Sequence, residues 1–187
     1  MNKKQLRVEF KNRRNNLSLE EIDNYSIEIA NLVIKLPIWD HSFYHVFLSI
    51  KSLKEVNTEP ILAILSGKDK NIIVSKTDFE AVAMTHVLLQ DSTVLKLNSH
   101  NIPEPESGIE ISSEQIEVVF IPLVAFDNLG NRVGYGKGFY DVFLKQCCKT
   151  TLKIGLSLFG AADSITDSQS HDIPLDYCIT PNKVYKF

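Results

Sequence analysis

Residues 118–144, VVFIPLVAFDNLGNRVGYGKGFYDVFL, place an apolar strand before a glycine-rich loop and a helix. Three glycines, Gly134, Gly136 and Gly138, allow the loop to take positive φ and to approach a ligand closely. The helix beyond them presents unpaired N–H groups and the positive end of its dipole. This order of parts predicts an anion site, and a phosphate group is the natural ligand.

Charged side chains in the same loop suit a nucleotide. Arg132 and Lys137 can pair with phosphate oxygens and Asp141 can hold a divalent cation, so a magnesium nucleotide fits better than a bare anion. The alternative is structural, because glycines can simply turn the chain and Asp141 can complement the helix dipole. The spacing matches neither a Walker A loop nor a dinucleotide fingerprint, so the residues indicate a phosphate ligand without naming an enzyme.

Composition and charge favour one compact domain over residues 1–187. The chain is 44% hydrophobic and 23% charged, which is ordinary for a globular protein of this length. A net charge of -3 gives no general attraction to nucleic acid, and no apolar run reaches the ~20 residues of a membrane span. Three cysteines form neither a disulfide framework nor a metal site. We therefore expect a cytoplasmic monomer that binds neither nucleic acid nor membranes.

The N-terminal run is basic, and its charges alternate with Leu6, Phe10 and Leu17 at helical spacing. The pattern alone favours an amphipathic helix whose charged face is solvated. The basic residues of this run are Lys3, Lys4, Arg7, Lys11, Arg13 and Arg14. The five histidines are scattered along the chain, so no metal-histidine centre and no acid-base histidine is predicted.

Helix and strand patterns alternate along the chain. Helices are predicted over 2–15, 18–35, 58–65 and 139–148, the second opened by a capping box of Ser18 and Glu21 and the third capped by Thr58. Strands are predicted over 43–50, 71–75, 84–90, 117–122, 152–159 and 176–180. Residues 93–97 are expected to pair antiparallel with 84–90, and 98–110 to form a loop because of its prolines and glycine.

This alternation predicts an α/β three-layer sandwich, with a mostly parallel sheet and helices on both faces. Ligands of such folds collect at the carboxyl ends of the strands. The glycine-rich loop, the turn from Glu55 to Thr58 and the segment leading to Asp176 are expected to converge there. Trp39 and Tyr44 are expected in the core because their neighbours are apolar.

Five segments, in order along the chain, resemble the 5-formyltetrahydrofolate cyclo-ligase family. DNLGNRVGYGKGFYD is similar to the family's signature FDxxGxRLGxGxGYYD. The other four are KKQLRVEFKNRRNNLSLEEI, KEVNT, NIPEP and GLSLFGAADSIT with HDIPLDYCIT. The resemblance covers nearly the whole chain. It implies a fold like those of sugar-phosphate isomerases and CoA transferases.

The activity implied by the resemblance is closure of 5-formyltetrahydrofolate, with or without a polyglutamate tail, to 5,10-methenyltetrahydrofolate, driven by ATP and Mg²⁺ with release of ADP and phosphate. Arg132, Lys137 and Tyr140 match residues at the reacting groups. The residues that match nucleotide-binding positions are Lys3, Lys4, Arg7, Arg132, Gly134, Tyr135, Gly136, Lys137, Gly138, Phe139 and Tyr140.

The resemblance also implies a folate site and a metal site. Positions near the folate are matched by Ile50, Glu55, Asn57, Glu104, Tyr135 and Phe139, and the metal ligands by Asp141 and Asp176. The chain departs from the family pattern at three of these residues: Phe139 replaces a tyrosine, Asn57 replaces an acidic residue, and Tyr135 stands at a variable position. His171 lies in a family-like His-Asp pair, where structural positioning is its expected role.

Two other classes of function stay open on the sequence. A non-catalytic sensor could keep the fold and bind nucleotide or folate, although the complete set of charged site residues argues for turnover. A different phosphate-handling enzyme of the same fold, such as a sugar-phosphate isomerase or a kinase, would bind sugar phosphates instead of the folate.

Overall fold

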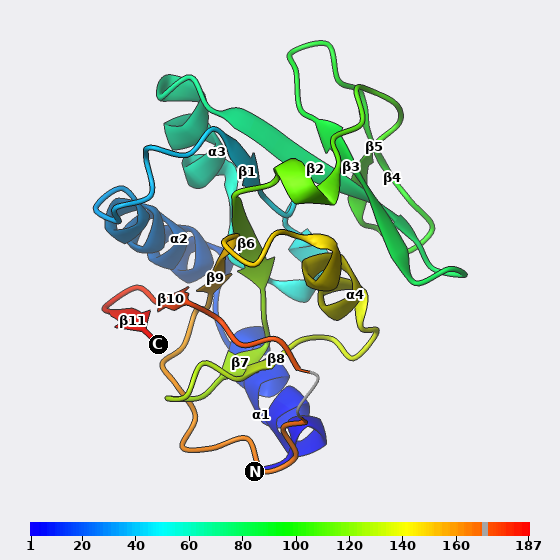
Figure 1. Ribbon diagram of the computed structural model, residues 1–187. Coiled ribbons are helices and arrows are strands. Elements are labelled where there is room, and N and C mark those ends of the chain that lie inside the picture. The colour runs from blue at the N-terminus through cyan, green and yellow to red at the C-terminus, as the bar shows by residue number, and fades with distance from the viewer. Residues whose placement is uncertain (170–171) are drawn as a thin grey trace.

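The computed structural model describes residues 1–169 and 172–187 (Figure 1). Its helices are α1 (Lys3–Asn15), α2 (Leu19–Val33), α3 (Glu59–Gly67) and α4 (Phe139–Gln146), with short 3-10 turns at Lys51–Leu53 and Ser113–Gln115. Its strands are β1 (Phe43–His45), β2 (Asn71–Asp78), β3 (Ala83–Leu88), β4 (Leu95–Leu97), β5 (Pro103–Pro105), β6 (Val118–Pro122), β7 (Ala125–Phe126), β8 (Arg132–Val133), β9 (Leu152–Leu156), β10 (Tyr177–Ile179) and β11 (Val184–Lys186).

Seven strands form the central sheet, in the order β11-β10-β9-β6-β1-β2-β3 (Figure 1). The five inner strands run parallel, and β3 and β11 join their edges antiparallel. β6 pairs along its whole length with β9 and through Val118 and Val119 with β1, and four of its five residues are buried. The mostly parallel sheet predicted from the sequence is confirmed.

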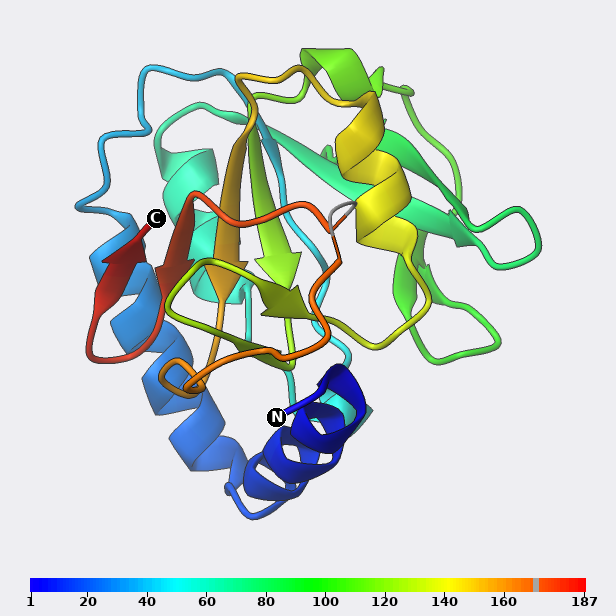
Figure 2. The same cartoon turned by 60° about the horizontal axis from the view of Figure 1, so that its bottom comes forward.

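Helices cover both faces of this sheet (Figure 2). Alternate strand residues point to opposite faces, so Tyr44 and Phe120 pack with α2 and α3, whereas Val119 and Ile121 pack with α4. Tyr44 is completely buried, and Trp39 stacks on it with the ring centroids 6.1 Å apart. The α/β class and the core role of Tyr44 are therefore confirmed, whereas Trp39 is only partly buried and packs against the core.

α1 lies across one end of the sheet, beside the β7–β8 hairpin (Figure 2). Asn2 and Gln5 form a capping box at its start, and Leu6 and Phe10 pack on Val124 and Val133. The predicted capping box of α2 is also present, with the Ser18 hydroxyl and the Glu21 carboxylate each accepting from the other's backbone N–H. Local sequence thus determines how these helices begin.

One predicted pairing and one predicted loop between residues 84 and 110 are wrong. β3 pairs with β2, while β4 pairs with β5 in a separate two-stranded ribbon. The supposed loop therefore contains a strand, in which Pro103 and Pro105 flank Glu104. A two-stranded ribbon tolerates prolines because each of its strands has a free edge, where a missing N–H costs no ladder bond.

The first strand is shorter than predicted and the third helix lacks its predicted side-chain cap. After His45 the chain turns, and the Thr58 hydroxyl donates to the Phe47 carbonyl at 2.8 Å instead of capping α3. The Ser49 hydroxyl likewise donates to the Val56 carbonyl. These bonds fold residues 46–58 into a compact loop at the carboxyl end of β1.

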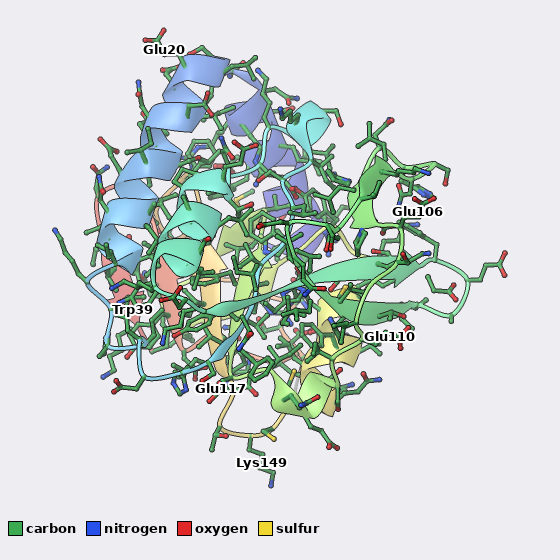
Figure 3. All side chains as sticks on the ribbon, turned by 90° about the horizontal axis from the view of Figure 1, so that it is seen from above. Glu20, Trp39, Glu106, Glu110, Glu117 and Lys149 are labelled. Atoms are coloured by element: carbon green, nitrogen blue, oxygen red, sulfur yellow. The ribbon has the colours of Figure 1, made fainter. Side chains whose placement is uncertain are left out.

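Charged side chains such as Glu20, Glu106 and Lys149 project outward around this fold (Figure 3). None of the helices that the structure describes has the length and apolar character that crossing a membrane requires. The described cysteines are free thiols, with Cys178 buried and Cys148 exposed.

Candidate functional site

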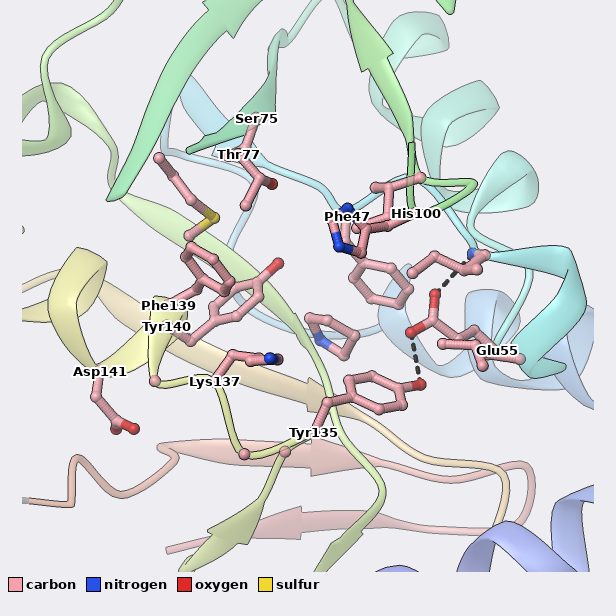
Figure 4. Close-up of a pocket in the computed structure, with 18 of the residues that line it drawn as sticks. Phe47, Glu55, Ser75, Thr77, His100, Tyr135, Lys137, Phe139, Tyr140 and Asp141 are labelled. Atoms are coloured by element: carbon pink, nitrogen blue, oxygen red, sulfur yellow. Dashed lines mark hydrogen bonds between the residues drawn. The ribbon is translucent and has the colours of Figure 1, made fainter. Parts of the chain in front are cut away.

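A cavity of about 400 Å³ lies where the parallel strands β1 and β6 end, between α1, the glycine-rich loop and the β4–β5 ribbon (Figure 4). Its volume is in the range of small-molecule sites. The wall combines apolar side chains with cationic residues. The lining residues include Lys3, Arg7, His45, Phe47, Ile50, Glu55, Ser75, Thr77, Phe79, Met84, His100, Arg132, Gly134, Tyr135, Gly136, Lys137, Gly138, Phe139, Tyr140, Asp141 and Asp172.

The glycine-rich loop joins β8 to α4, and the backbone of its second half has the conformation expected of an anion site. Gly136 and Gly138 have φ of 95° and 82°, values that favour glycine, whereas Gly134 does not have positive φ, contrary to the prediction. Gly138 begins α4 without a side-chain cap. Within the described chain, the N–H groups of Phe139 and Tyr140 have no acceptor. They remain available to a ligand anion.

Two residues of α1 reach the same end of the cavity. Arg7 donates from Nε to the Gly134 carbonyl at 2.8 Å, and its guanidinium lies against Gly136. A Cβ added to Gly136 would lie 3.3 Å from the Arg7 Cζ, so only glycine fits without displacement. Lys3 forms an ion pair with Asp172 and also lines the cavity. α1 thus brings two cations to a loop more than 120 residues away in sequence.

Arg132 and Asp141 form an ion pair at the start of α4, with Nη2 and Oδ1 2.6 Å apart. The Arg132 side chain is only 8% exposed, and its Nε is buried with no partner among the described residues. A buried donor without an acceptor is costly, which makes Arg132 a candidate to bind an anion. Lys137 is exposed in the loop between the two positive-φ glycines.

A buried network joins the glycine-rich loop to the loop after β1 (Figure 4). The Tyr135 hydroxyl donates to Glu55 Oε1 at 2.7 Å and accepts from Arg14 Nη1 at 2.7 Å, and the Ile50 N–H donates to Glu55 Oε2. Arg14 also donates to the Leu123 carbonyl. Burial raises the pKa of Glu55, and the hydrogen bonds from Ile50 and Tyr135 partly offset this effect.

The burial of Arg14 contradicts the predicted solvated helix face, because only 4% of this residue is exposed. The spacing of residues along α1 could have predicted this burial. Arg14 follows Leu6 and Phe10 at intervals of four residues and so lies on the apolar face of α1. A cation on that face needs buried partners, and Tyr135 and Leu123 provide them.

Aromatic rings narrow the cavity on the side of the ribbon. Phe79 stacks on His100 with their centroids 3.9 Å apart, and it meets Phe139 edge to face at 5.2 Å. Tyr140 lies nearby in the lining, and burial raises the pKa of its hydroxyl above the ordinary value. This part of the cavity suits a flat apolar ring system. Phe79 and His100 were not predicted, because they lie in the turns of the β2–β3 and β4–β5 hairpins and neither hairpin was predicted.

Two histidines that are far apart in the sequence lie side by side in the sheet. His45 and His86, on β1 and β3, approach within 5.5 Å between ring centroids, and Ser75 of β2 lies between them. The sheet therefore joins residues that the sequence leaves scattered. His171 lies outside the described residues.

Most of the predicted site residues line the cavity. They are Lys3, Arg7, Ile50, Glu55, Arg132, Gly134, Tyr135, Gly136, Lys137, Gly138, Phe139, Tyr140 and Asp141. Four predicted residues are not part of the lining: Lys4, Asn57, Glu104 and Asp176. Lys4 is exposed on α1, and the Asn57 side chain bonds Asp23 and the Glu59 N–H. The Glu104 carboxylate accepts from the N–H of Thr77, a lining residue, and Glu104 itself does not line the cavity.

Asp176 lies at the amino end of β10, not at the carboxyl edge where the prediction placed it. Its Oδ2 accepts from the Lys153 N–H at 2.7 Å and pairs with Lys153 Nζ at 2.8 Å. Among the described residues no group of three or more histidines, cysteines or acidic residues could hold a metal ion.

Comparisons with known proteins agree over nearly the whole chain. A family model described as the 5-formyltetrahydrofolate cyclo-ligase family matches residues 1–181. A 5-formyltetrahydrofolate cyclo-ligase of Mus musculus is 33% identical over 153 residues, which cover 78% of this chain and 74% of that protein. One of Escherichia coli (strain K12) is 28% identical over 95% of this chain and 100% of its own. The solved structure of an Aquifex aeolicus 5,10-methenyltetrahydrofolate synthetase covers 100% of this chain and 93% of its own, with a TM-score of 0.84 and 29% identity.

Proposed function

The chain belongs to the 5-formyltetrahydrofolate cyclo-ligase family, and we propose that it closes 5-formyltetrahydrofolate to 5,10-methenyltetrahydrofolate at the expense of ATP. One observation carries this proposal. Four cationic side chains line one end of the cavity, together with the N–H groups at the start of α4, which have no acceptor in the described chain, and the other walls are mainly apolar and aromatic. A site that binds a polyphosphate beside a flat organic substrate needs cations and N–H donors for the phosphates and an apolar wall for the ring.

The proposed chemistry overcomes a poor electrophile. A formamide carbon resists attack because its nitrogen donates into the carbonyl group. Transfer of the γ-phosphoryl group to the formyl oxygen forms an O–P bond, breaks the β–γ bond and releases ADP. N10 of the folate then attacks the activated carbon, its proton leaves, and the C–O bond breaks with release of phosphate. Atoms and charge balance without a redox partner.

For phosphoryl transfer the protein mainly positions the reactants and neutralises charge. We assign this role to Arg132, Lys137, Lys3 and Arg7, together with the loop backbone from Gly134 to Tyr140. Arg132 is supported by its buried Nε, which has no partner among the described residues, and Tyr140 by its place in the lining at the start of α4. Lys4 is exposed on α1 and does not line the cavity, so it would contribute only long-range charge.

Mg²⁺ typically binds ATP phosphates together with one or two protein carboxylates. Asp141 fits this requirement, because it lines the cavity beside Arg132, and its second carboxylate oxygen accepts no hydrogen bond from the described residues. Bound Mg²⁺ would neutralise phosphate charge during transfer. Asp176 fits less well as a ligand, since Lys153 holds its carboxylate at the amino end of β10.

The folate is proposed to occupy the aromatic half of the cavity. Phe139 offers a ring face, while Ile50 and Glu55 supply an apolar wall and a buried carboxylate that can accept from the amino-pyrimidine edge. Glu104 and Asn57 would act through the backbone, at Thr77 and Glu59, rather than by direct contact. Whether the folate carries extra glutamates affects only its tail.

The test is the appearance of the methenyltetrahydrofolate chromophore when the purified protein is mixed with 5-formyltetrahydrofolate, ATP and Mg²⁺. We expect product only in the complete mixture, with no signal when ATP or Mg²⁺ is omitted. Absence of product from a folded protein that still binds ATP would contradict the proposal. Product without ATP would contradict the phosphorylation step.

A further inference from the structure

Two histidines and a serine on neighbouring strands form a continuous hydrogen-bonded chain under the cavity. His45 Nε2 lies 2.7 Å from Ser75 Oγ, and Ser75 Oγ lies 3.0 Å from His86 Nδ1. Both imidazoles are buried, with 0% and 3% of the residue exposed, and they pack on Phe143 of α4. Ser75 is only partly buried and, like His45, lines the cavity.

Both imidazoles are neutral at physiological pH. Burial lowers the pKa of His86 to about 4. For His45 burial is again the main cause of a lowered pKa, His86 adds to it, and the Phe120 carbonyl acts in the opposite direction. An imidazole with a lowered pKa is a weak base. The chain of three residues is therefore suited to hold a ligand group in place rather than to accept its proton.

The serine hydroxyl has one hydrogen-bonding position more than its two neighbours use. A hydroxyl offers one donor and two acceptor positions, and each neutral imidazole nitrogen occupies one of them. The third position on Ser75 Oγ has no partner among the described residues and is free for a ligand, because Ser75 lines the cavity. Because the two imidazoles also restrict rotation of the side chain, this position is presented in a fixed direction.

The charges around Ser75 indicate which part of a ligand it meets. Thr77, Met84, Phe79 and Phe139 line this part of the cavity, and Figure 4 shows Ser75 and Thr77 away from Asp141 and from Tyr135. A phosphate or a glutamate carboxylate would be placed beside the cations instead. A neutral ring with polar edges is the complementary ligand.

We propose that Ser75 is a substrate-binding residue whose hydroxyl hydrogen-bonds a neutral polar group on the pteridine end of the folate, and that His45 and His86 are positioning residues that orient it. This inference rests on the proposed function for the identity of the ligand. It assigns a specificity role to a β2 residue and to two histidines that the proposed phosphoryl chemistry does not use.

The experiment compares Ser75→Ala and Ser75→Thr with the wild type, and uses Ser66→Ala on the exposed face of α3 as the matched control. Loss of one neutral hydrogen bond should raise the KM for 5-formyltetrahydrofolate about five- to ten-fold in Ser75→Ala and leave the KM for ATP unchanged. Ser75→Thr keeps the hydroxyl and should stay near the wild type. Affinity for p-aminobenzoylglutamate, which lacks the pteridine, should not change in Ser75→Ala.

The histidines are tested by the same KM measurements. His86→Asn keeps an amide group near the position of Nδ1 and should retain most folate affinity, whereas His86→Phe should resemble Ser75→Ala. Equal effects of the two changes would contradict a positioning role through the hydrogen bond.

Calorimetric titration of 5-formyltetrahydrofolate separates failure of this inference from failure of the proposed function. A wild type that binds the folate but makes no product contradicts the proposed activity, and its affinity relative to Ser75→Ala still tests the inference. Equal affinities, an equal rise of the KM for ATP, or a Ser75→Thr variant as weak as Ser75→Ala would overturn the role of Ser75. A wild type that does not bind the folate would overturn both proposals.

Discussion

Arg132 and Asp141 meet at the edge of the cavity, and each holds the other in place for a ligand. In Asp141→Asn the amide can still accept from Arg132, but it cannot neutralise a cation. We expect turnover to fall by roughly 100-fold or more, while the thermal unfolding midpoint changes little. The measurement is the initial rate of chromophore formation over a range of Mg²⁺ concentrations.

Asp91→Asn is the control for that variant, because Asp91 is exposed in the turn before β4 and lies outside the cavity lining. It should retain wild-type turnover. Wild-type turnover in Asp141→Asn as well would remove Asp141 from the metal site.

The buried histidine pair makes stability depend on pH. The pKa of His86 is about 4 in the folded protein against 6.5 as its ordinary value, so the unfolded chain binds the proton more readily. Stability is therefore unaffected above pH 6.5 and is lost as pH falls toward 4, by roughly 2 kcal/mol at pH 5. His86→Asn cannot titrate in this range. Between pH 7 and pH 5, the wild type should lose more thermal stability than this variant, and parallel pH profiles would contradict the assignment.

At the scale of elements, α1 is held to the glycine-rich loop by a buried cation. Arg14→Lys removes the bond to Tyr135 or to Leu123, because one ammonium cannot reproduce the guanidinium's geometry. We expect a loss of about 2 to 3 kcal/mol in the free energy of unfolding, measured by urea denaturation. Arg13→Lys is the matched control on the neighbouring exposed position and should change it by less than about 0.5 kcal/mol. Similar losses in both variants would indicate that helix propensity, not burial, is responsible.

The glycine-rich loop itself provides a matched pair. In Gly136→Ala the new methyl group meets Arg7 at positive φ, whereas Gly134→Ala encounters no atom within 4 Å and no unusual φ. Gly136→Ala should weaken ATP binding several-fold and destabilise the protein by about 1 kcal/mol or more. Gly134→Ala should do neither. Isothermal titration with ATP and thermal unfolding of both variants decide the point.

At the scale of the whole molecule, the buried central sheet differs from the more exposed β4–β5 ribbon. β6 is buried along its length apart from Pro122, whereas all three residues of β4 are exposed. Hydrogen exchange followed by mass spectrometry should show amides of β6 and β9 protected up to global unfolding, and those of β4 exchanging at least 100-fold faster. Bound 5-formyltetrahydrofolate should slow exchange at the ribbon, because His100 and Pro103 line the cavity. Equal protection of β4 and β6 would contradict this division.

Much of the site was predictable where its residues are adjacent in sequence. The strand, glycine-rich loop and helix of residues 118–144 were recognised from apolar runs and glycine spacing, and α4 ends within two residues of the prediction. The capping box of α2 was recognised for the same reason, since it depends on residues three apart. Lys3 and Arg7 could be connected with the loop only through the family resemblance.

The sequence by itself determined the α/β class, the family and the glycine-rich loop, because periodicity and motifs are properties of neighbouring residues. Only the tertiary structure decided which distant side chains meet. Tyr135 contacts Glu55 across 80 residues and Arg14 across 121, and strand order alone brings His45, Ser75 and His86 together. The same limitation explains the errors at β4, β5 and Asp176. Strand partners and strand direction depend on the packing of the whole chain, and no local pattern encodes them.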